Sequence, residues 1–162
     1  MPVQPEVLSY LGRLGFEFEA LDCDPELADT AAFCLNYGYA PETAANTIVV
    51  ASKRPPGEFV ACLVLATTRL DVNGKVRETT GWKKASFAPA EETSRLTGMA
   101  IGGVTPFALP PEVPLFIDSA VMDRPWVIVG AGSRSAKLKI EPADLVRLPG
   151  AVVVPGLANP AV

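Results

Sequence analysis

The sequence predicts a single α/β domain in which a mixed, mostly antiparallel and curled sheet is flanked by short helices. Helical and strand patterns intermix along the chain, and short turns join many of the strands. The chain has 162 residues, of which 49% are hydrophobic, so it suits one compact core. We expect the domain to cover residues 1–154 and the tail, residues 155–162, to be frayed.

The helices are predicted from apolar spacing and from the residues that begin and end each segment. Apolar residues recur at helical spacing from Gln4 to Leu14, and Gly15 ends the pattern. Asp24 and Pro25 favour a helix start, because aspartate caps free N–H groups and proline fits the first turn. The predicted helices cover residues 4–14, 24–37, 89–98 and 142–148, with one further helical turn at 41–45. The segment 71–80 has the length and polarity of a short helix and is assigned to one, although Asn73-Gly74 also signals a turn.

The strands are predicted from apolar and β-branched runs between turn signals. The runs 48–51 and 59–67 flank a turn at 53–58 and predict a hairpin. Because both runs are apolar throughout, we place this hairpin at the centre of the sheet. The other predicted strands cover residues 16–21, 85–87, 114–118, 126–129, 137–140 and 151–154.

The absence of histidine restricts the chemistry that this chain can perform. With no histidine in the sequence, catalysis by Ser-His-Asp or Cys-His groups and the common zinc sites built on histidine are excluded. Chemistry must then rest on carboxylates, lysines, hydroxyls, backbone amides or groups of the substrate. We expect no metal ion and no other cofactor.

Cysteine usage, hydropathy and charge predict a cytoplasmic protein that does not enter a membrane. Cys23, Cys34 and Cys62 are odd in number and scattered, which is typical of reduced thiols. No apolar run approaches the roughly 20 residues that span a bilayer, and residues 1–15 lack the pattern of a secretory signal. The net charge of −4 argues against coating of long nucleic acids by charge alone. The sequence leaves the oligomeric state open.

The stretch 97–121 contains the most distinctive loop of the chain. Gly102 and Gly103 allow positive φ and close approach of the backbone to another molecule, and Pro106 stiffens the exit. These residues predict a rigid loop whose amide N–H groups point outward and can hold a carbonyl or an oxyanion. The residues alone leave open the alternative of a plain connection between strands.

Eight segments together resemble a known family. They are the helix with residues 30–32, the strand start at 46–50, the strand 59–67, the helix end at 97–98, the loop 102–107 with the sequence GGVTP, the strand end at 116–118, the glycine turn at 130–132 and the helix start at 142–145. In this order and spacing they resemble the YbaK family, the editing domains associated with prolyl-tRNA synthetase. The resemblance covers about residues 25–154, and the GGVTP sequence is its most specific part.

The resemblance implies hydrolysis of the ester that joins a wrong amino acid to the 3′ end of a tRNA, by a free-standing protein. The implied partner is the tRNA acceptor end, and recruitment by an aminoacyl-tRNA synthetase is left open. In this family the 2′-hydroxyl of the terminal adenosine helps to activate the attacking water, a mechanism that needs no histidine.

The resemblance also implies which residues form the site. The loop amides would hold the aminoacyl carbonyl, and the acid would orient water or an amino group. The implied catalytic residues are Gly102, Gly103, Val104, Thr105 and Asp118. The implied substrate contacts are Asn46, Thr47, Pro106, Gly130 and Gly132.

One position departs from the family, because Asn46 stands where the family has a lysine. Asparagine is neutral and shorter, so two hypotheses stay open. The protein is either a deacylase of altered specificity or efficiency, or a non-catalytic member that binds an aminoacyl group, a nucleotide or a protein. Asn46 either contacts the substrate or only caps the strand start. Lys53 and Arg54 lie about seven residues along the strand, roughly 20 Å away, and compensation by either of them from the rim is left open.

Overall fold

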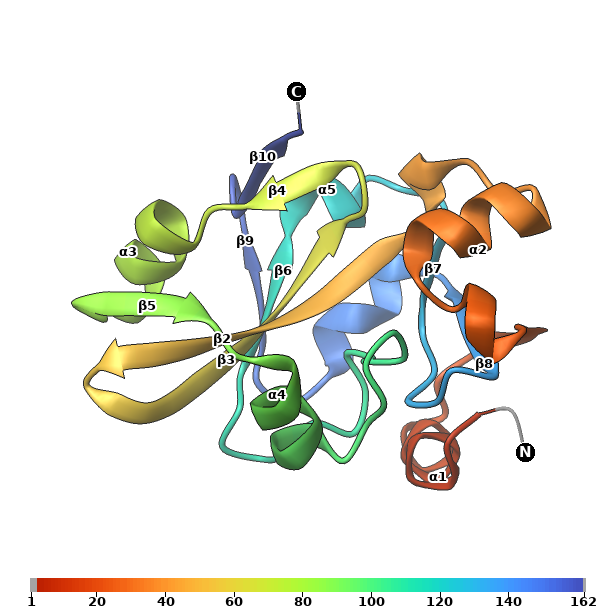
Figure 1. Ribbon diagram of the computed structural model, residues 1–162, viewed down its shortest axis with the longest axis horizontal. Coiled ribbons are helices and arrows are strands. Elements are labelled where there is room, and N and C mark those ends of the chain that lie inside the picture. Colours follow the sequence, from red (N-terminus) through yellow and green to blue (C-terminus); the bar gives the residue numbers. More distant parts are fainter. Residues whose placement is uncertain (1–2, 162) are drawn as a thin grey trace.

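A computed structural model describes residues 3–161 and confirms an α/β domain with mixed sheets and short helices (Figure 1). The predicted central hairpin is present as two long antiparallel strands, and most of the other predicted strands are found within a few residues of their expected bounds. The strands are β1 Glu19–Asp22, β2 Ala45–Arg54, β3 Pro56–Leu65, β4 Thr68–Leu70, β5 Lys84–Phe87, β6 Leu115–Asp118, β7 Val127–Gly130, β8 Ala136–Ile140, β9 Ala151–Val154 and β10 Ala158–Pro160.

The strands form three sheets rather than one curled sheet. The largest has the order β5-β2-β3-β6-β9, with β5, β2 and β3 antiparallel and β3, β6 and β9 parallel. A second sheet, β1-β8-β7, lies beside the start of β2, and β10 pairs with β4. A single parallel bridge between Ala44 and Ile128 joins the second sheet to the entry of β2. Among residues 3–161 this bridge is the only backbone pairing between the two sheets, and a space lined by Ala44 and Ile128 opens beside it.

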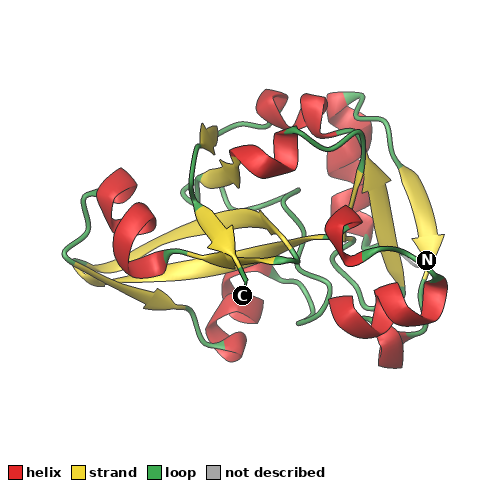
Figure 2. Ribbon diagram, turned by 90° about the horizontal axis from the view of Figure 1, so that it is seen from above, coloured by secondary structure: helices red, strands yellow, loops and turns green. Residues whose placement is uncertain are grey.

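The helices are short and lie on both sides of the large sheet (Figure 2). The α-helices are α1 Pro5–Leu14, α2 Thr30–Tyr37, α3 Arg77–Thr80, α4 Ala90–Thr97 and α5 Ser119–Met122. The 3-10 helices are η1 Pro25–Leu27, η2 Pro41–Thr43 and η4 Pro142–Arg147, and η3 Val72–Val76 is a π-helix that runs into α3. Gly15 ends α1 with a φ of 63°, as the sequence predicted.

The predicted helix 24–37 is wrong at its start. Asp24 caps η1, where its carboxylate accepts a hydrogen bond from the N–H of Glu26 at 2.9 Å. The chain then becomes extended at Asp29, with φ −63° and ψ 138°, so α2 begins only at Thr30. This break in the predicted helix brings Asp29 to the edge of the space between the two sheets.

The predicted fraying of residues 155–162 is also wrong for the part that the structure describes. Leu157 is fully buried, and the following residues form β10, which pairs antiparallel with β4. The N–H of Ala161 continues this pairing by donating to the carbonyl of Thr67 at 3.1 Å. Burial of the Leu157 side chain and pairing of an otherwise free strand edge explain why this segment is ordered.

Both faces of the central strands are buried, as their continuous apolar character predicts. Leu63 and Ile117 belong to one cluster of buried residues, which also includes side chains of α1, β7 and β8. Their neighbours Cys62 and Phe116 belong to a second cluster on the opposite face. No helix within residues 3–161 is long and apolar enough to cross a membrane.

Candidate functional site

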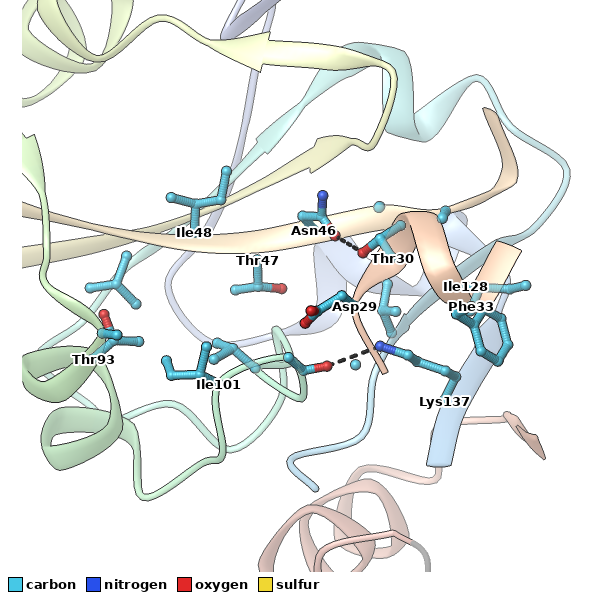
Figure 3. A pocket seen from close by; sticks show the side chains of 18 of the residues that line it. Asp29, Thr30, Phe33, Asn46, Thr47, Ile48, Thr93, Ile101, Ile128 and Lys137 are labelled. Atoms are coloured by element: carbon cyan, nitrogen blue, oxygen red, sulfur yellow. Dashed lines mark hydrogen bonds between the residues drawn. The ribbon is translucent and has the colours of Figure 1, made fainter. Parts of the chain in front are cut away.

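A cavity of about 380 Å³ lies where the start of β2, the start of α2 and the loop after α4 come together (Figure 3). We call residues 100–106 the glycine loop. Residues of β7 and β8, and residues 88–93 at the start of α4, form the remaining walls of the cavity. It is therefore built from segments far apart in the sequence.

The cavity collects half of the site residues that the sequence predicted. The predicted residues that line it are Asn46, Thr47, Gly102, Val104 and Gly130. The predicted residues that do not line it are Gly103, Thr105, Pro106, Asp118 and Gly132. At the end of the loop Thr105 and Pro106 are buried, and no described group pairs with the hydroxyl of Thr105.

Three consecutive carbonyl groups of the glycine loop accept hydrogen bonds from the segment 132–137. The pairs are Arg134 Nη1 with the carbonyl of Ile101 (2.7 Å), Lys137 Nζ with that of Gly102 (3.0 Å) and Gly132 N with that of Gly103 (2.6 Å). In a trans peptide the C=O and the N–H lie in one plane and point in opposite directions. Each of these bonds therefore also directs the following N–H group away from its partner in the segment 132–137.

The N–H groups of the loop differ in what they contact. The N–H of Gly103 donates to the carbonyl of Ala100 at 2.8 Å and closes a turn. The N–H groups of Gly102 and Val104 have no hydrogen-bond acceptor among residues 3–161, and both residues line the cavity. These two amides are consequently available to a ligand.

Glycine is required where the loop and the β7–β8 turn pack backbone to backbone. A Cβ at Gly103 would overlap the main chain of Ser133, and one at Gly130 would overlap the carbonyl of Val104. Glycine at position 132 is required for a different contact, because a Cβ there would overlap the side chain of Gln4. The close approach of the two backbones is what allows the hydrogen bonds between them.

Among the described residues that line the cavity, Asp29 and Lys137 carry charge. The Asp29 carboxylate is exposed and pairs with Arg134 Nη1 at 3.4 Å. Lys137 is 6% exposed, and its Nζ also donates to the carbonyl of Ala28 at 2.5 Å. Burial lowers the pKa of Lys137, and nearby Arg134 lowers it further, whereas Asp29 acts in the opposite direction.

The sequence model of the family described as aminoacyl-tRNA editing domain matches residues 24–148 of this chain. The chain belongs to this family. The resemblance to the YbaK family is thereby confirmed, and membership implies, in general terms, a deacylase-type hydrolase that acts on aminoacyl-tRNA.

The chain is also similar to individual proteins. The uncharacterized protein YwhH of Bacillus subtilis (strain 168) is 32% identical over 112 residues, which are 64% of this chain and 71% of that protein. The crystal structure of hypothetical protein APE2540 has a TM-score of 0.85 at 28% identity, covering 95% of this chain and 99% of the other. A putative trans-editing enzyme for prolyl tRNA synthetase has a TM-score of 0.81 at 23% identity, covering 98% and 99%, and shows the shared fold.

In this editing domain Asn46 is tied to the start of α2. Its Oδ1 accepts a hydrogen bond from Thr30 Oγ1 at 2.5 Å. The adjacent Thr47 has a buried hydroxyl with no partner among the described residues, so it can serve a ligand. Lys53 and Arg54 are exposed at the far end of β2 and do not line the cavity.

Asp118 occupies a different part of the editing domain from the cavity. It ends β6, precedes α5 and is only 2% exposed. Burial raises the pKa of Asp118, and the nearby main-chain amides of Leu157 and Ala120 act in the opposite direction. Its carboxylate therefore lies among the backbone amides of the tail and α5 instead of facing the glycine loop.

Two of the charged groups at the site were missed by sequence reasoning. Asp29 was assigned to the interior of a predicted helix, and only the break before α2 exposes it to the cavity. Lys137 alternates with apolar residues of β8, a pattern that predicts an exposed side chain. Among residues 3–161, no group of three or more cysteine, aspartate or glutamate residues is placed to hold a metal ion.

Proposed function

We propose that this protein is a trans-editing deacylase that hydrolyses the ester of mischarged aminoacyl-tRNA, with the N–H groups of Gly102 and Val104 holding the ester carbonyl. The observation that carries the proposal is the pair of amides without acceptors at the wall of a cavity. Their orientation is fixed by bonded carbonyls on the other side of each peptide, so they need little reorganisation when charge develops.

The reaction requires one water molecule and no cofactor. The water oxygen attacks the ester carbon, and the two amides stabilise the negative charge that develops on the carbonyl oxygen. The bond from carbon to the ribose oxygen then breaks, and the proton lost by water passes by way of the neighbouring ribose hydroxyl to the departing oxygen. The products are a free amino acid and tRNA. Loss of a single oxyanion donor typically costs about 100- to 1,000-fold in kcat.

The other cavity groups suit the remaining parts of the substrate. The Asp29 carboxylate lies beside Gly102 and has the charge to bind the α-ammonium group of the aminoacyl moiety. We assign contacts with the terminal nucleotide to Asn46 and to the unpaired hydroxyl of Thr47. Since Asp29 lines the cavity and Asp118 does not, we assign the acidic role to Asp29.

A deacylation assay against a panel of mischarged tRNAs tests the proposal, with Gly102→Ala as the diagnostic variant. Gly102 has a φ of 88°, and a Cβ there would displace the Arg134 guanidinium, so the loop amides should shift and turnover should be lost. Gly57→Ala is the matched control, because Gly57 has a similar φ of 92° but open space around it. The control should keep full activity at a comparable cost in backbone strain.

Asn46→Lys separates a weakened deacylase from a binding protein. A lysine at this position adds a cation to the cavity, so an active but inefficient enzyme should gain turnover. Tight binding of aminoacyl-tRNA by the wild type, with no turnover in either form, would instead identify a binding protein and overturn the proposal.

A further inference from the structure

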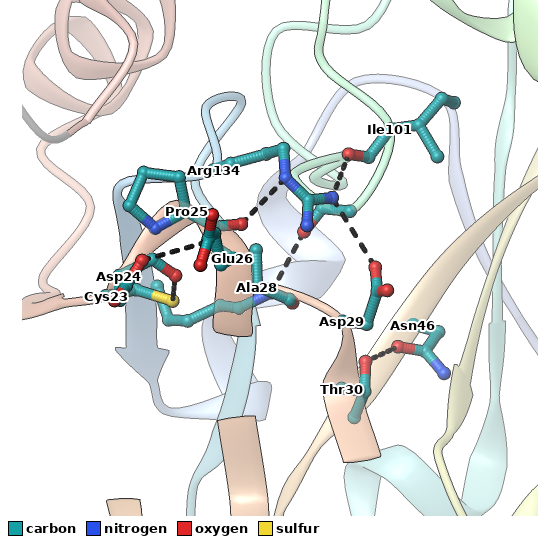
Figure 4. A network of polar contacts seen from close by, with 12 residues as sticks. Cys23, Asp24, Pro25, Glu26, Ala28, Asp29, Thr30, Asn46, Ile101 and Arg134 are labelled. Carbon is teal, nitrogen blue, oxygen red and sulfur yellow. Dashed lines mark hydrogen bonds and ion pairs between the residues drawn. The ribbon is translucent and has the colours of Figure 1, made fainter. Parts of the chain in front are cut away.

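The Arg134 guanidinium donates hydrogen bonds to two main-chain carbonyls from different segments. Its Nη1 donates to the carbonyl of Ile101 at 2.7 Å, and its Nε donates to the carbonyl of Pro25 at 2.9 Å (Figure 4). The first acceptor belongs to the glycine loop, and the second to the segment that leads into α2. One guanidinium therefore links the two walls of the cavity.

Lys137 repeats this pattern deeper in the structure. Its Nζ donates to the carbonyl of Gly102 in the glycine loop and to the carbonyl of Ala28 just before α2. No carboxylate among residues 3–161 lies within ion-pair distance of this buried ammonium group. Burial of an unpaired charge is costly, and a neutral side chain would fill the same space without that cost. The positive charge of Lys137 therefore has a role that a neutral side chain could not fill.

The Arg134 link acts on a group that the proposed function requires, and the Lys137 link holds the Gly102–Gly103 peptide between the two free amides. The carbonyl of Ile101 that accepts from Arg134 lies in the same peptide plane as the N–H of Gly102. The hydrogen bond therefore sets the direction of that N–H. Arg134 also pairs with Asp29, the acid on the opposite wall. A charged donor on a carbonyl polarises the whole peptide, so it also strengthens the N–H of Gly102 as a donor.

We propose that Arg134 and Lys137 act as a two-cation clamp that holds the glycine loop against the segment 25–29 and thereby positions the Gly102 amide opposite Asp29. The inference rests on the proposed function for its kinetic consequence. Both are positioning residues, because they act through main-chain carbonyls of the loop and the segment before α2.

The kinetic test compares Arg134→Met and Lys137→Met with the wild type in deacylation of mischarged tRNA. Misplacement of reacting groups by about 1 Å costs on the order of 100-fold, so kcat should fall by about 10- to 100-fold while KM changes little. Lys139→Met is the matched control: Lys139 lies on the same strand, but its Nζ is 4.3 Å from the centre of the Trp126 ring, outside the cavity. This control should retain wild-type kcat.

The double variant Arg134→Met, Lys137→Met tests whether the two residues act together. If both cations hold one loop, the loss in kcat should be much smaller than the product of the two single losses. Independent, multiplicative losses would overturn the clamp, as would unchanged kcat in both single variants. Arg134 is about one-third exposed, so Arg134→Met decides the question even if Lys137→Met does not fold.

A readout that does not depend on catalysis keeps the clamp separate from the proposed function. The N–H of Gly103 is bonded to Ala100 within the clamped loop, and its hydrogen exchange reports whether the loop opens. Exchange should accelerate by at least about tenfold in either variant while the core amides of β3 stay protected. If the wild type proves inactive and this acceleration is seen, the proposed function fails and the clamp stands. Unchanged exchange at Gly103 would overturn the clamp.

Discussion

Asp29 and Asp118 have nearly the same local geometry and opposite surroundings. Each is the residue before a helix, with φ −63° and ψ 138° at Asp29 and φ −62° and ψ 134° at Asp118. Yet Asp29 is exposed at the cavity beside Arg134, whereas Asp118 is buried among main-chain amides of the tail and α5.

The difference teaches that local backbone geometry does not determine the role of an acid. Asp118 follows a central strand of the large sheet and is covered by residues 157–158. Asp29 follows a short 3-10 helix at the edge of the fold, where the space between two sheets opens. We therefore expect Asp118 to contribute to stability and Asp29 to substrate binding, which can be tested separately.

The largest expected effect on stability is that of Asp118→Ala. Asp118→Ala leaves buried main-chain amides without their acceptor, which typically costs about 1–3 kcal/mol. The free energy of unfolding, measured in urea, should fall by this amount while deacylation per folded molecule is unchanged. A large loss of kcat in folded Asp118→Ala would contradict the comparison, because it would place this acid in the chemistry.

The second effect is on activity. Asp29→Ala removes the charge proposed to bind the α-ammonium group, and charged hydrogen bonds contribute about 1.5–3 kcal/mol, so kcat/KM should fall by about 10- to 100-fold. Stability should change by less than about 1 kcal/mol, since an exposed ion pair contributes little.

A modified substrate serves as the control for Asp29→Ala. An N-acetylated aminoacyl ester has no ammonium charge, so wild type and variant should hydrolyse it at similar rates. An equal loss of activity on both esters would show that Asp29 acts through Arg134 and the loop rather than through the ammonium group.

The smallest expected effect is a dependence of stability on pH. Folding raises the pKa of Asp118, so the folded state holds this proton more tightly than the unfolded state. The contribution of Asp118 to stability is therefore greatest below the ordinary aspartate pKa of about 4 and is lost as the pH rises through the raised value. Denaturant unfolding at several pH values should show this decline for the wild type. Asp118→Asn should remove the part of this decline that is due to Asp118. An unchanged decline in the variant would contradict the assignment to Asp118.

Much of the fold follows from local patterns that the sequence contains. The helix that ends at Gly15 and the central hairpin depend on apolar spacing and on turn residues within the same short segment. The tail was predicted incorrectly because its order depends on Leu157 and on the free edge of β4, about 90 residues earlier in the chain.

The sequence by itself determined that histidine chemistry is excluded, that a glycine loop follows α4 and that the chain resembles editing domains. Only the tertiary structure decided which amides of that loop are free, because their orientation depends on donors at Gly132 and Arg134, roughly 30 residues away in the chain. It also decided that Lys137 is buried and Lys139 is not. Both lie on one face of β8, and only the first is covered by the segment before α2, 109 residues distant in the chain.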